Sequence, residues 1–151
     1  MTPLDGRKPF CPEDSIGFLL KRCGTLLTIT VDRALAEFDM THAQLGIFLR
    51  LVNGSANTAS DLARELMTDT GSMTRMLDRL EEKGFIERSR DGEDRRVVQV
   101  RLTGKGESLA DKMAAIGLAS VNHHLRGFSD DEITMFKDLL RRMIANAEPA
   151  N

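Results

Sequence analysis

Hydroxyl and guanidinium side chains gather on one short segment, residues 70 to 79. The members of this group are Thr70, Ser72, Thr74, Arg75 and Arg79. A guanidinium carries a planar fork of N–H donors that matches a guanine edge or a phosphate, and hydroxyl groups contact both as well. On the outer side of a helix, these groups would suit the reading of a DNA major groove.

A second basic group follows, made of Arg88, Arg90, Arg95 and Arg96. At the end of a protruding hairpin, such arginines could enter a narrow minor groove or contact phosphates. The alternative is that they only pair with the nearby acids Glu87, Asp91, Glu93 and Asp94, because a mixed charge run is usually a solvated surface. Residues 86 to 101 hold five arginines and four acids, so the charge count leaves both interpretations open. The arrangement of the elements has to decide.

Helix signals place the first group on the second of two short helices. Thr58 and Asp61 form a capping box, which predicts a helix over residues 59 to 67. Asp69 is a good N-cap for a second helix that begins at Thr70 only a few residues later. The two helices are therefore joined by a tight turn.

The second helix has an apolar stripe and a strong stop signal. The stripe comprises Met73, Met76, Leu77 and Leu80, which follow the spacing of a buried helix face. Arg75 is then expected to point furthest outward. A cation at Lys83 and a glycine at Gly84 are typical of a helix end.

A hairpin is predicted next, with strands at residues 86 to 90 and 95 to 102 and a tip at residues 91 to 94. Val98, Val100 and Leu102 would share one face, and Gln99 and Arg101 the other. Two short helices followed by an arginine-tipped hairpin form a winged helix-turn-helix, in which one helix enters the major groove. This order favours contact with duplex DNA over a solvated charge run.

These residues resemble the MarR family of bacterial regulators. The resemblance is carried by Met73-Thr74-Arg75, Asp78-Arg79-Leu80-Glu81, Lys83-Gly84, Asp94-Arg95-Arg96 and Leu102-Thr103-Gly104-Lys105-Gly106. It implies that the hairpin is a DNA-binding wing. It also implies that Asp94 orients Arg96 by a salt bridge.

Helices on both sides of this part complete the expected fold, which is mainly α with a small β-hairpin wing. An apolar stripe runs from about Asp14 to Phe38, and Thr41 caps a second helix. After the wing, Thr103 is expected to cap a long helix that continues through Val121, and Ser129 to Glu132 is a capping box for the last helix. That last helix is expected to pack through Ile133, Phe136, Leu140 and Ile144.

The chain is expected to form a single domain with three parts. Residues 1 to 12 would form a flexible arm, 13 to 40 and 105 to 147 dimerisation helices, and 41 to 104 the DNA-binding part. The long apolar stripes exceed what a small winged domain can cover, which leaves a single-chain bundle and a dimer open. The resemblance favours a homodimer on a pseudo-palindromic operator of double-stranded DNA.

The resemblance also implies an effector, a small aromatic acid that releases a repressor from DNA. His42, at the start of the second helix, is a candidate for the pocket, and Arg22 is a candidate anion partner together with Lys21. Each of these has a simpler interpretation as a solvated residue. An activator would have the same sequence features.

A thiol-oxidation-responsive regulator of the same fold is the alternative mechanism. Cys11 in the arm is the candidate redox residue, whereas Cys23 on the apolar stripe is expected to be a small core residue. The peroxide-sensing branch of the family surrounds its sensor with tyrosines, and this chain has none. That absence counts against the oxidation mechanism.

Enzymatic and metal-dependent functions are not expected. No nucleophile or phosphate-binding motif is recognisable, and no cofactor is predicted. His123 and His124 point about 100° apart on a helix, so they cannot easily share one ion. No metal site is therefore predicted.

Composition sets the remaining limits. With 151 residues and 41% hydrophobic content, the chain can form one core. No long apolar run or signal pattern is present, so a cytoplasmic protein without membrane contact is expected. The net charge of −2 requires a local basic surface for DNA binding. A winged-helix protein-interaction module without DNA binding is the remaining alternative.

Overall fold

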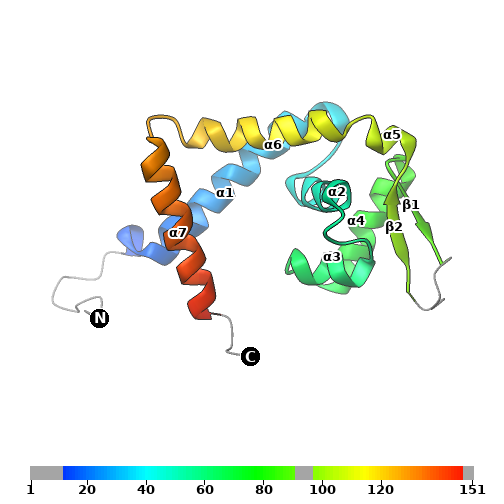
Figure 1. The fold of residues 1–151 in the computed structure, drawn as a ribbon, viewed down its shortest axis with the longest axis horizontal. Helices are drawn as coiled ribbons and strands as arrows, with labels where there is room; N and C mark the ends of the chain where they lie inside the picture. Colours follow the sequence, from blue (N-terminus) through cyan, green and yellow to red (C-terminus); the bar gives the residue numbers. More distant parts are fainter. Residues whose placement is uncertain (1–11, 91–96, 148–151) are drawn as a thin grey trace. The chain divides into compact units, whose positions relative to one another are not determined.

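The computed structural model describes residues 12–90 and 97–147, and within them the chain is mostly helical (Figure 1). The elements are a 3-10 turn η1 (Pro12–Asp14), α1 (Ile16–Leu35), a 3-10 turn η2 (Ala36–Phe38), α2 (His42–Asn53), α3 (Ala59–Glu65), α4 (Thr70–Glu82), β1 (Ile86–Ser89), β2 (Gln99–Leu102), α5 (Gly104–Glu107), α6 (Ala110–His124) and α7 (Asp130–Ala147). Two compact units can be distinguished, Met1–Ser120 and Val121–Asn151. They are described separately. None of the described helices is both long and apolar enough to cross a bilayer.

The first helix is shorter than its apolar stripe predicts. The side chain of Ser15 accepts a hydrogen bond from the amide of Phe18 and caps α1 at its start. The helix ends at Leu35, and η2 leads to Asp39, whose φ of 50° is left-handed. The prediction of one helix through Phe38 is therefore wrong at its end, because the chain tightens and reverses there.

The second helix is fixed at its start by its own side chains and by one from α1. Thr41 and Gln44 form the capping box that the sequence predicts only in part. In addition, the amide of His42 donates to Oδ1 of Asp32 at 2.6 Å. The carboxylate of Asp32 therefore satisfies a main-chain donor at the positive end of α2.

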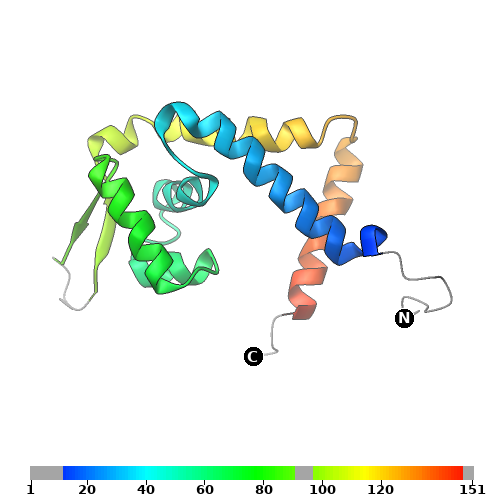
Figure 2. The same cartoon turned by 180° about the vertical axis from the view of Figure 1, so that it is seen from behind.

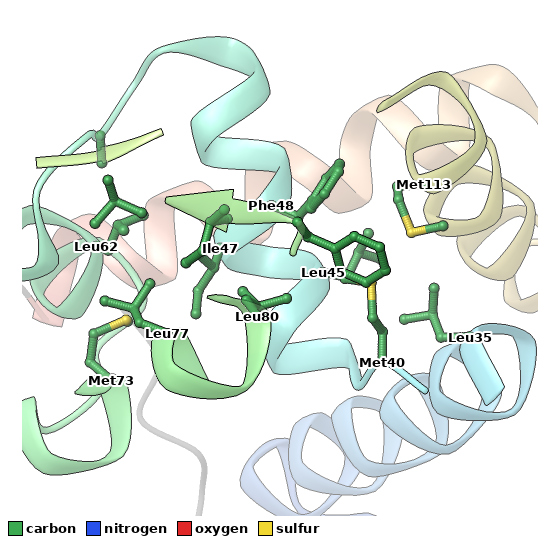
Figure 3. Close-up of a cluster of buried hydrophobic side chains, with 14 of the residues drawn as sticks. Leu35, Met40, Leu45, Ile47, Phe48, Leu62, Met73, Leu77, Leu80 and Met113 are labelled. Atoms are coloured by element: carbon green, nitrogen blue, oxygen red, sulfur yellow. The ribbon is translucent and has the colours of Figure 1, made fainter. Parts of the chain in front are cut away.

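One hydrophobic core connects α1, α2, α3, α4, β1, β2 and α6. Its largest buried side chains include Leu35, Ile47, Phe48, Leu62, Met73, Leu77, Leu80, Ile86 and Met113. Figure 3 shows how the labelled members converge from different helices. The buried residues of α4 match the stripe expected from the sequence, with Met76 at its half-buried edge.

The two strands pair antiparallel, with Ile86 opposite Leu102 and Ser89 opposite Gln99. The second strand begins at Gln99. The prediction that it begins near residue 95 is wrong for residues 97 and 98, which are not in a strand, whereas residues 95 and 96 lie outside the described residues. The amide of Val100 donates to the carbonyl of Asn57 at 2.8 Å, which ties β2 to the loop before α3.

The helix expected after the wing is interrupted. Thr103 caps only α5, where its hydroxyl accepts from the amide of Gly106 at 3.1 Å, and α6 begins separately at Ala110. Gly106 is buried, and a Cβ built there would lie 2.2 Å from the carbonyl oxygen of Phe85. The missing side chain of Gly106 therefore lets α5 approach the main chain just before β1 closely.

The second unit contains α7, which begins with the predicted capping box. The amide of Ser129 donates to Glu132 at 2.8 Å, and the amide of Glu132 donates to the hydroxyl of Ser129 at 3.2 Å. None of the residues of α7 is buried within this chain. Of the four residues expected to pack, Ile133 and Leu140 are half-buried in the single chain, whereas Phe136 and Ile144 are exposed.

Candidate nucleic-acid interface

The turn between α3 and α4 is tight and is held by main-chain contacts. The hydroxyl of Thr58 accepts from the amide of Asp61 at 3.0 Å, as the capping box predicts. The helix ends at Glu65, two residues earlier than expected, because Met67 takes a left-handed φ of 48°. The amide of Thr68 then donates to the carbonyl of Ala63 at 2.9 Å. Met67 is 94% exposed at the apex of this turn.

Asp69 fixes the start of α4. Its Oδ1 accepts from the amide of Ser72 at 2.8 Å. This hydrogen bond, with a further one from the Ser72 side chain, holds the pKa of the Asp69 carboxyl below its ordinary value. The ionised carboxylate complements the positive end of the helix.

The outer face of α4 carries the predicted recognition residues. Those exposed are Thr70, Thr74, Arg75 and Arg79, and Ser72 is half-buried. The Nη2 of Arg75 donates to the hydroxyl of Ser72 at 2.9 Å, so the guanidinium is held close to the helix start. Arg79 makes no side-chain hydrogen bond or ion pair within the described chain, and its donors are free for a partner.

Some of the predicted recognition residues also line a recess on the surface. Ser72, Arg75, Met76 and Arg79 line a recess of about 250 Å³ on α4. Figure 2 shows α4 in green beside the two strands, which lie along one end of the same compact unit. The polar donors lie on the outer face of α4, and the buried apolar stripe lies on its opposite face. A helix that enters the major groove of DNA needs this arrangement.

Arg88 faces α4, and its partners differ from those expected. Its Nε donates to Oε2 of Glu81 at 2.9 Å, and its Nη2 lies 2.7 Å from Oδ1 of Asp78. Its amide also donates to Glu81 at 3.1 Å. The suggested pairing with Glu87 is therefore wrong for Arg88, whereas Asp91 lies outside the described residues. Its guanidinium joins β1 to α4, and the contact with a phosphate stays a prediction.

The rest of the wing is only partly described. Arg90 is exposed beyond the end of β1. Asp94, Arg95 and Arg96 lie outside the described residues, as does Asp91. The DNA contacts expected of these residues, and the orienting salt bridge from Asp94 to Arg96, therefore stay predictions.

The candidate ligand residues Arg22 and His42 lie on α1 and α2. Arg22 is exposed on α1. His42 is half-buried, and its Nδ1 lies 3.2 Å from the hydroxyl of Thr28. This contact and the hydrogen bond from the main-chain amide of His42 to Asp32 join α1 to α2. The sequence does not reveal the Asp32 contact, since the two residues are ten positions apart across a reversal of the chain.

The cysteine predictions have different outcomes. Cys11 lies outside the described residues. Cys23 is exposed in this chain, so its assignment to the core is wrong. The reason is that the first half of α1 has no partner helix within the compact core, which takes only Val31 and Leu35 from α1 as buried residues. Among the described residues, no group of three or more histidine, cysteine or acidic side chains could hold a metal ion.

The contact between Arg88 and Glu81 predicts a pH-dependent stability. The hydrogen bond from Arg88 holds the pKa of the Glu81 carboxyl below its ordinary value. A lowered pKa in the folded state stabilises the fold above the unfolded pKa, and the contribution is lost as pH falls through the folded pKa. Glu81→Gln should therefore destabilise the protein at pH 7, and the difference from wild type should shrink below about pH 4.5.

Urea denaturation at several pH values would measure this difference. Glu82→Gln is the matched control, since Glu82 is exposed and its side chain has no ion pair among the described residues. A Glu81→Gln difference that stays constant from pH 7 to about pH 3 would contradict an ionised pair.

Comparison with known proteins gives a consistent result. The MarR family model matches residues 40–98. The multiple antibiotic resistance protein MarR of Escherichia coli strain K12 is 30% identical over 118 residues, which cover 75% of this chain and 82% of that protein.

Solved structures agree in fold. A crystal structure of MarR is 28% identical, with a TM-score of 0.77 over 97% of this chain and 95% of that one. The structure of CouR from Rhodococcus jostii RHA1 bound to p-coumaroyl-CoA has a TM-score of 0.80 at 24% identity and covers 95% of this chain and 99% of that chain. The helical architecture with a two-stranded wing is thereby confirmed. The chain belongs to the MarR family of DNA-binding transcriptional regulators.

Proposed function

We propose that the protein is a homodimeric, sequence-specific repressor that inserts α4 of each protomer into the major groove of a pseudo-palindromic operator. The observation that carries the proposal is the outer face of α4, where Arg75 is held by Ser72 and Arg79 has no partner among the described residues. Guanidinium groups in this position are suited to guanine edges. Residues 41 to 104 then serve as the DNA-binding part, and residues 13 to 40 and 105 to 147 as the dimerisation helices.

The exposed apolar side chains of α7 support dimerisation. Met135, Phe136, Leu139, Met143 and Ile144 are exposed in the single chain, between 43% and 64% of their surface. Phe136, Leu139, Met143 and Ile144 follow the spacing of one helix face. Contiguous apolar surface of this kind marks a protein interface rather than a solvated helix. A two-fold dimer would place half-site centres about one helical turn of DNA apart.

Release from DNA is assigned to a small aromatic anion. CouR, which has the same fold, has been crystallised with p-coumaroyl-CoA, so this fold can hold an anionic aromatic ligand. In the proposed mechanism the ligand binds most tightly to a dimer in which the distance between the two recognition helices does not match the operator. The fraction of operator DNA that is bound by the protein therefore falls. The effector shifts the population from the DNA-binding dimer to the wrongly spaced dimer only as far as its affinities for these two forms differ.

Fluorescence anisotropy with the upstream intergenic DNA of its own gene and a scrambled fragment tests the DNA-binding function. Tight binding to the native fragment that weakens steeply with salt is expected, because phosphate contacts release counterions. Analytical ultracentrifugation of the free protein tests the dimer separately. Equal weak binding to both fragments at low salt would favour the protein-interaction module instead. Transcription from the same promoter, with and without the protein, separates a repressor from an activator.

Arg75→Ala is expected to weaken binding to the native fragment by about tenfold while binding to scrambled DNA changes little. The reason is that a base-reading guanidinium contributes to discrimination, whereas phosphate contacts act on any sequence. Anisotropy on both fragments measures the two affinities. Arg50→Ala is the control, since Arg50 lies on α2, outside the recognition residues and the proposed dimerisation helices, and pairs with Glu65. An equal loss on both fragments would make Arg75 a phosphate contact.

A further inference from the structure

A cavity of about 390 Å³ lies beside the wing, apart from the recognition residues of α4. Its lining residues are Leu51, Val52, Asn57, Val100, Arg101, Leu102, Glu107 and Ala110. They come from the end of α2, the loop before α3, strand β2, helix α5 and the first residue of α6. All of these belong to the compact unit that ends at Ser120, and Figure 1 shows β2 and α5 adjoining each other there.

Part of the cavity lining is apolar, and a main-chain hydrogen bond anchors the strand that carries it. Val100 is buried, and Leu51, Leu102 and Ala110 are half-buried. The hydrogen bond from the Val100 amide to Asn57 fixes β2 on the side away from β1. Because alternate residues of an antiparallel strand direct their main-chain groups to the same edge, the N–H and C=O of Leu102 also point away from β1. The cavity therefore has apolar side chains and a main-chain strand edge.

The rim carries two opposite charges that are not paired. Arg101 and Glu107 both line the cavity. Neither side chain makes a hydrogen bond or ion pair within the described chain. Other arginines nearby do find acids, as Arg50 does with Glu65 at 3.1 Å. The Asn57 side chain adds an amide, which can both donate and accept.

From this arrangement we infer a binding site for an α-amino acid with a large apolar side chain, such as phenylalanine or leucine. Its carboxylate would bind the Arg101 guanidinium, and its ammonium group would bind the Glu107 carboxylate. The apolar side chain would cover Val100, Leu51 and Leu102. The volume is at the low end of small-molecule pockets, which suits a ligand of this size.

Charge complementarity distinguishes this ligand from simpler ones. A carboxylic acid without an amine would leave Glu107 unpaired and close to a second negative charge. An amine without a carboxylate would leave the guanidinium of Arg101 unpaired. A zwitterion alone satisfies both groups while its side chain removes apolar surface from water. The site does not depend on the proposed DNA-binding function, and its test needs no DNA.

Titration of the full-length protein with L-phenylalanine, followed by backbone and methyl NMR, tests the inference. Shifts are expected at Leu51, Val100 and Leu102, with saturation in the millimolar range. 3-Phenylpropionate and phenethylamine, which each lack one charge, should bind at least about tenfold more weakly, a difference of about 1.4 kcal/mol. Absence of saturable shifts at these three residues would overturn the proposal, as would equal binding of the three compounds.

Two variants test whether Arg101 and Glu107 bind the charged groups of the ligand. Arg101→Gln and Glu107→Gln should each weaken phenylalanine binding about tenfold. Glu107→Gln should also reduce the preference for phenylalanine over 3-phenylpropionate, since the acid no longer faces a negative rim. Arg64→Gln is the control, because Arg64 lies on α3 outside the cavity and pairs with Asp61. Unchanged affinity in both rim variants, with their folded NMR spectra preserved, would refute the assigned recognition.

Discussion

Replacing Phe48 with alanine is expected to lower the free energy of unfolding by about 3–5 kcal/mol. Phe48 is fully buried on α2 and lies in the core near Leu45 and Met113 (Figure 3). The substitution removes apolar contacts and leaves a cavity, and the surrounding helices can close it only in part. Urea denaturation at one fixed protein concentration, with wild type measured in parallel, gives the difference.

Val52→Ala is the matched control for Phe48→Ala. Val52 lies four residues further along α2 and is 40% exposed, so the loss should stay below about 1 kcal/mol. If both variants lost the same stability, the core would not be centred on Phe48. A Phe48→Ala loss under about 1 kcal/mol would lead to the same conclusion.

Gly106→Ala should destabilise the protein by about 3 kcal/mol, at the upper end of the range for overpacking. The added methyl would lie 2.2 Å from the carbonyl oxygen of Phe85, which belongs to the main chain and cannot rotate away. Next to this contact, the hydroxyl of Thr103 donates to the carbonyl of Gly84 at 2.6 Å. Moving α5 away would therefore loosen the start of the wing, and DNA affinity should fall along with stability.

Gly104→Ala separates the steric effect from helix propensity. Gly104 belongs to the same short helix, and a Cβ built there meets no atom within 4 Å. Alanine at this position should be neutral or stabilise by up to about 1 kcal/mol, because it restricts the unfolded chain. Thermal and urea denaturation of the pair would show whether the variants move in opposite directions. A Gly106→Ala protein as stable as Gly104→Ala would contradict the close contact.

The parts of the fold that depend on local hydrogen bonds could be predicted from the sequence. Thr58, Asp69 and Ser129 cap the helices that their positions indicate, because a cap joins residues only three apart in the chain. The outward position of Arg75 on α4 followed from the apolar stripe opposite it. These features need no knowledge of the rest of the molecule.

Contacts between elements could not be predicted in the same way. Other acids lie closer than Glu81 to Arg88 in the chain, so the charge pattern of the wing does not indicate this pair. Arg88 contacts Glu81 because β1 packs against α4. The interruption between α5 and α6 has a similar origin. Thr103 signals a helix start, but the approach of Gly106 to Phe85 occurs because the chain returns to the beginning of β1.

Burial was predicted least well on the terminal helices. The stripe on α1 suggested a buried Cys23, yet this thiol is exposed in the single chain. The periodicity of apolar residues indicates that a helix face will be covered, and it does not tell which chain covers it. The exposed apolar residues of α7 present the same ambiguity, which the proposed dimer would resolve.

The shared core has a consequence for protein engineering. Val31 and Leu35 of α1 and Met113 of α6 are buried in one cluster with Leu77 and Leu80 of α4, the proposed recognition helix. Grafting residues 41 to 104 into a relative would therefore place foreign surfaces against α1 and α6. A chimera with altered operator preference must import the matching core residues as well, or exchange only the exposed side chains of α4.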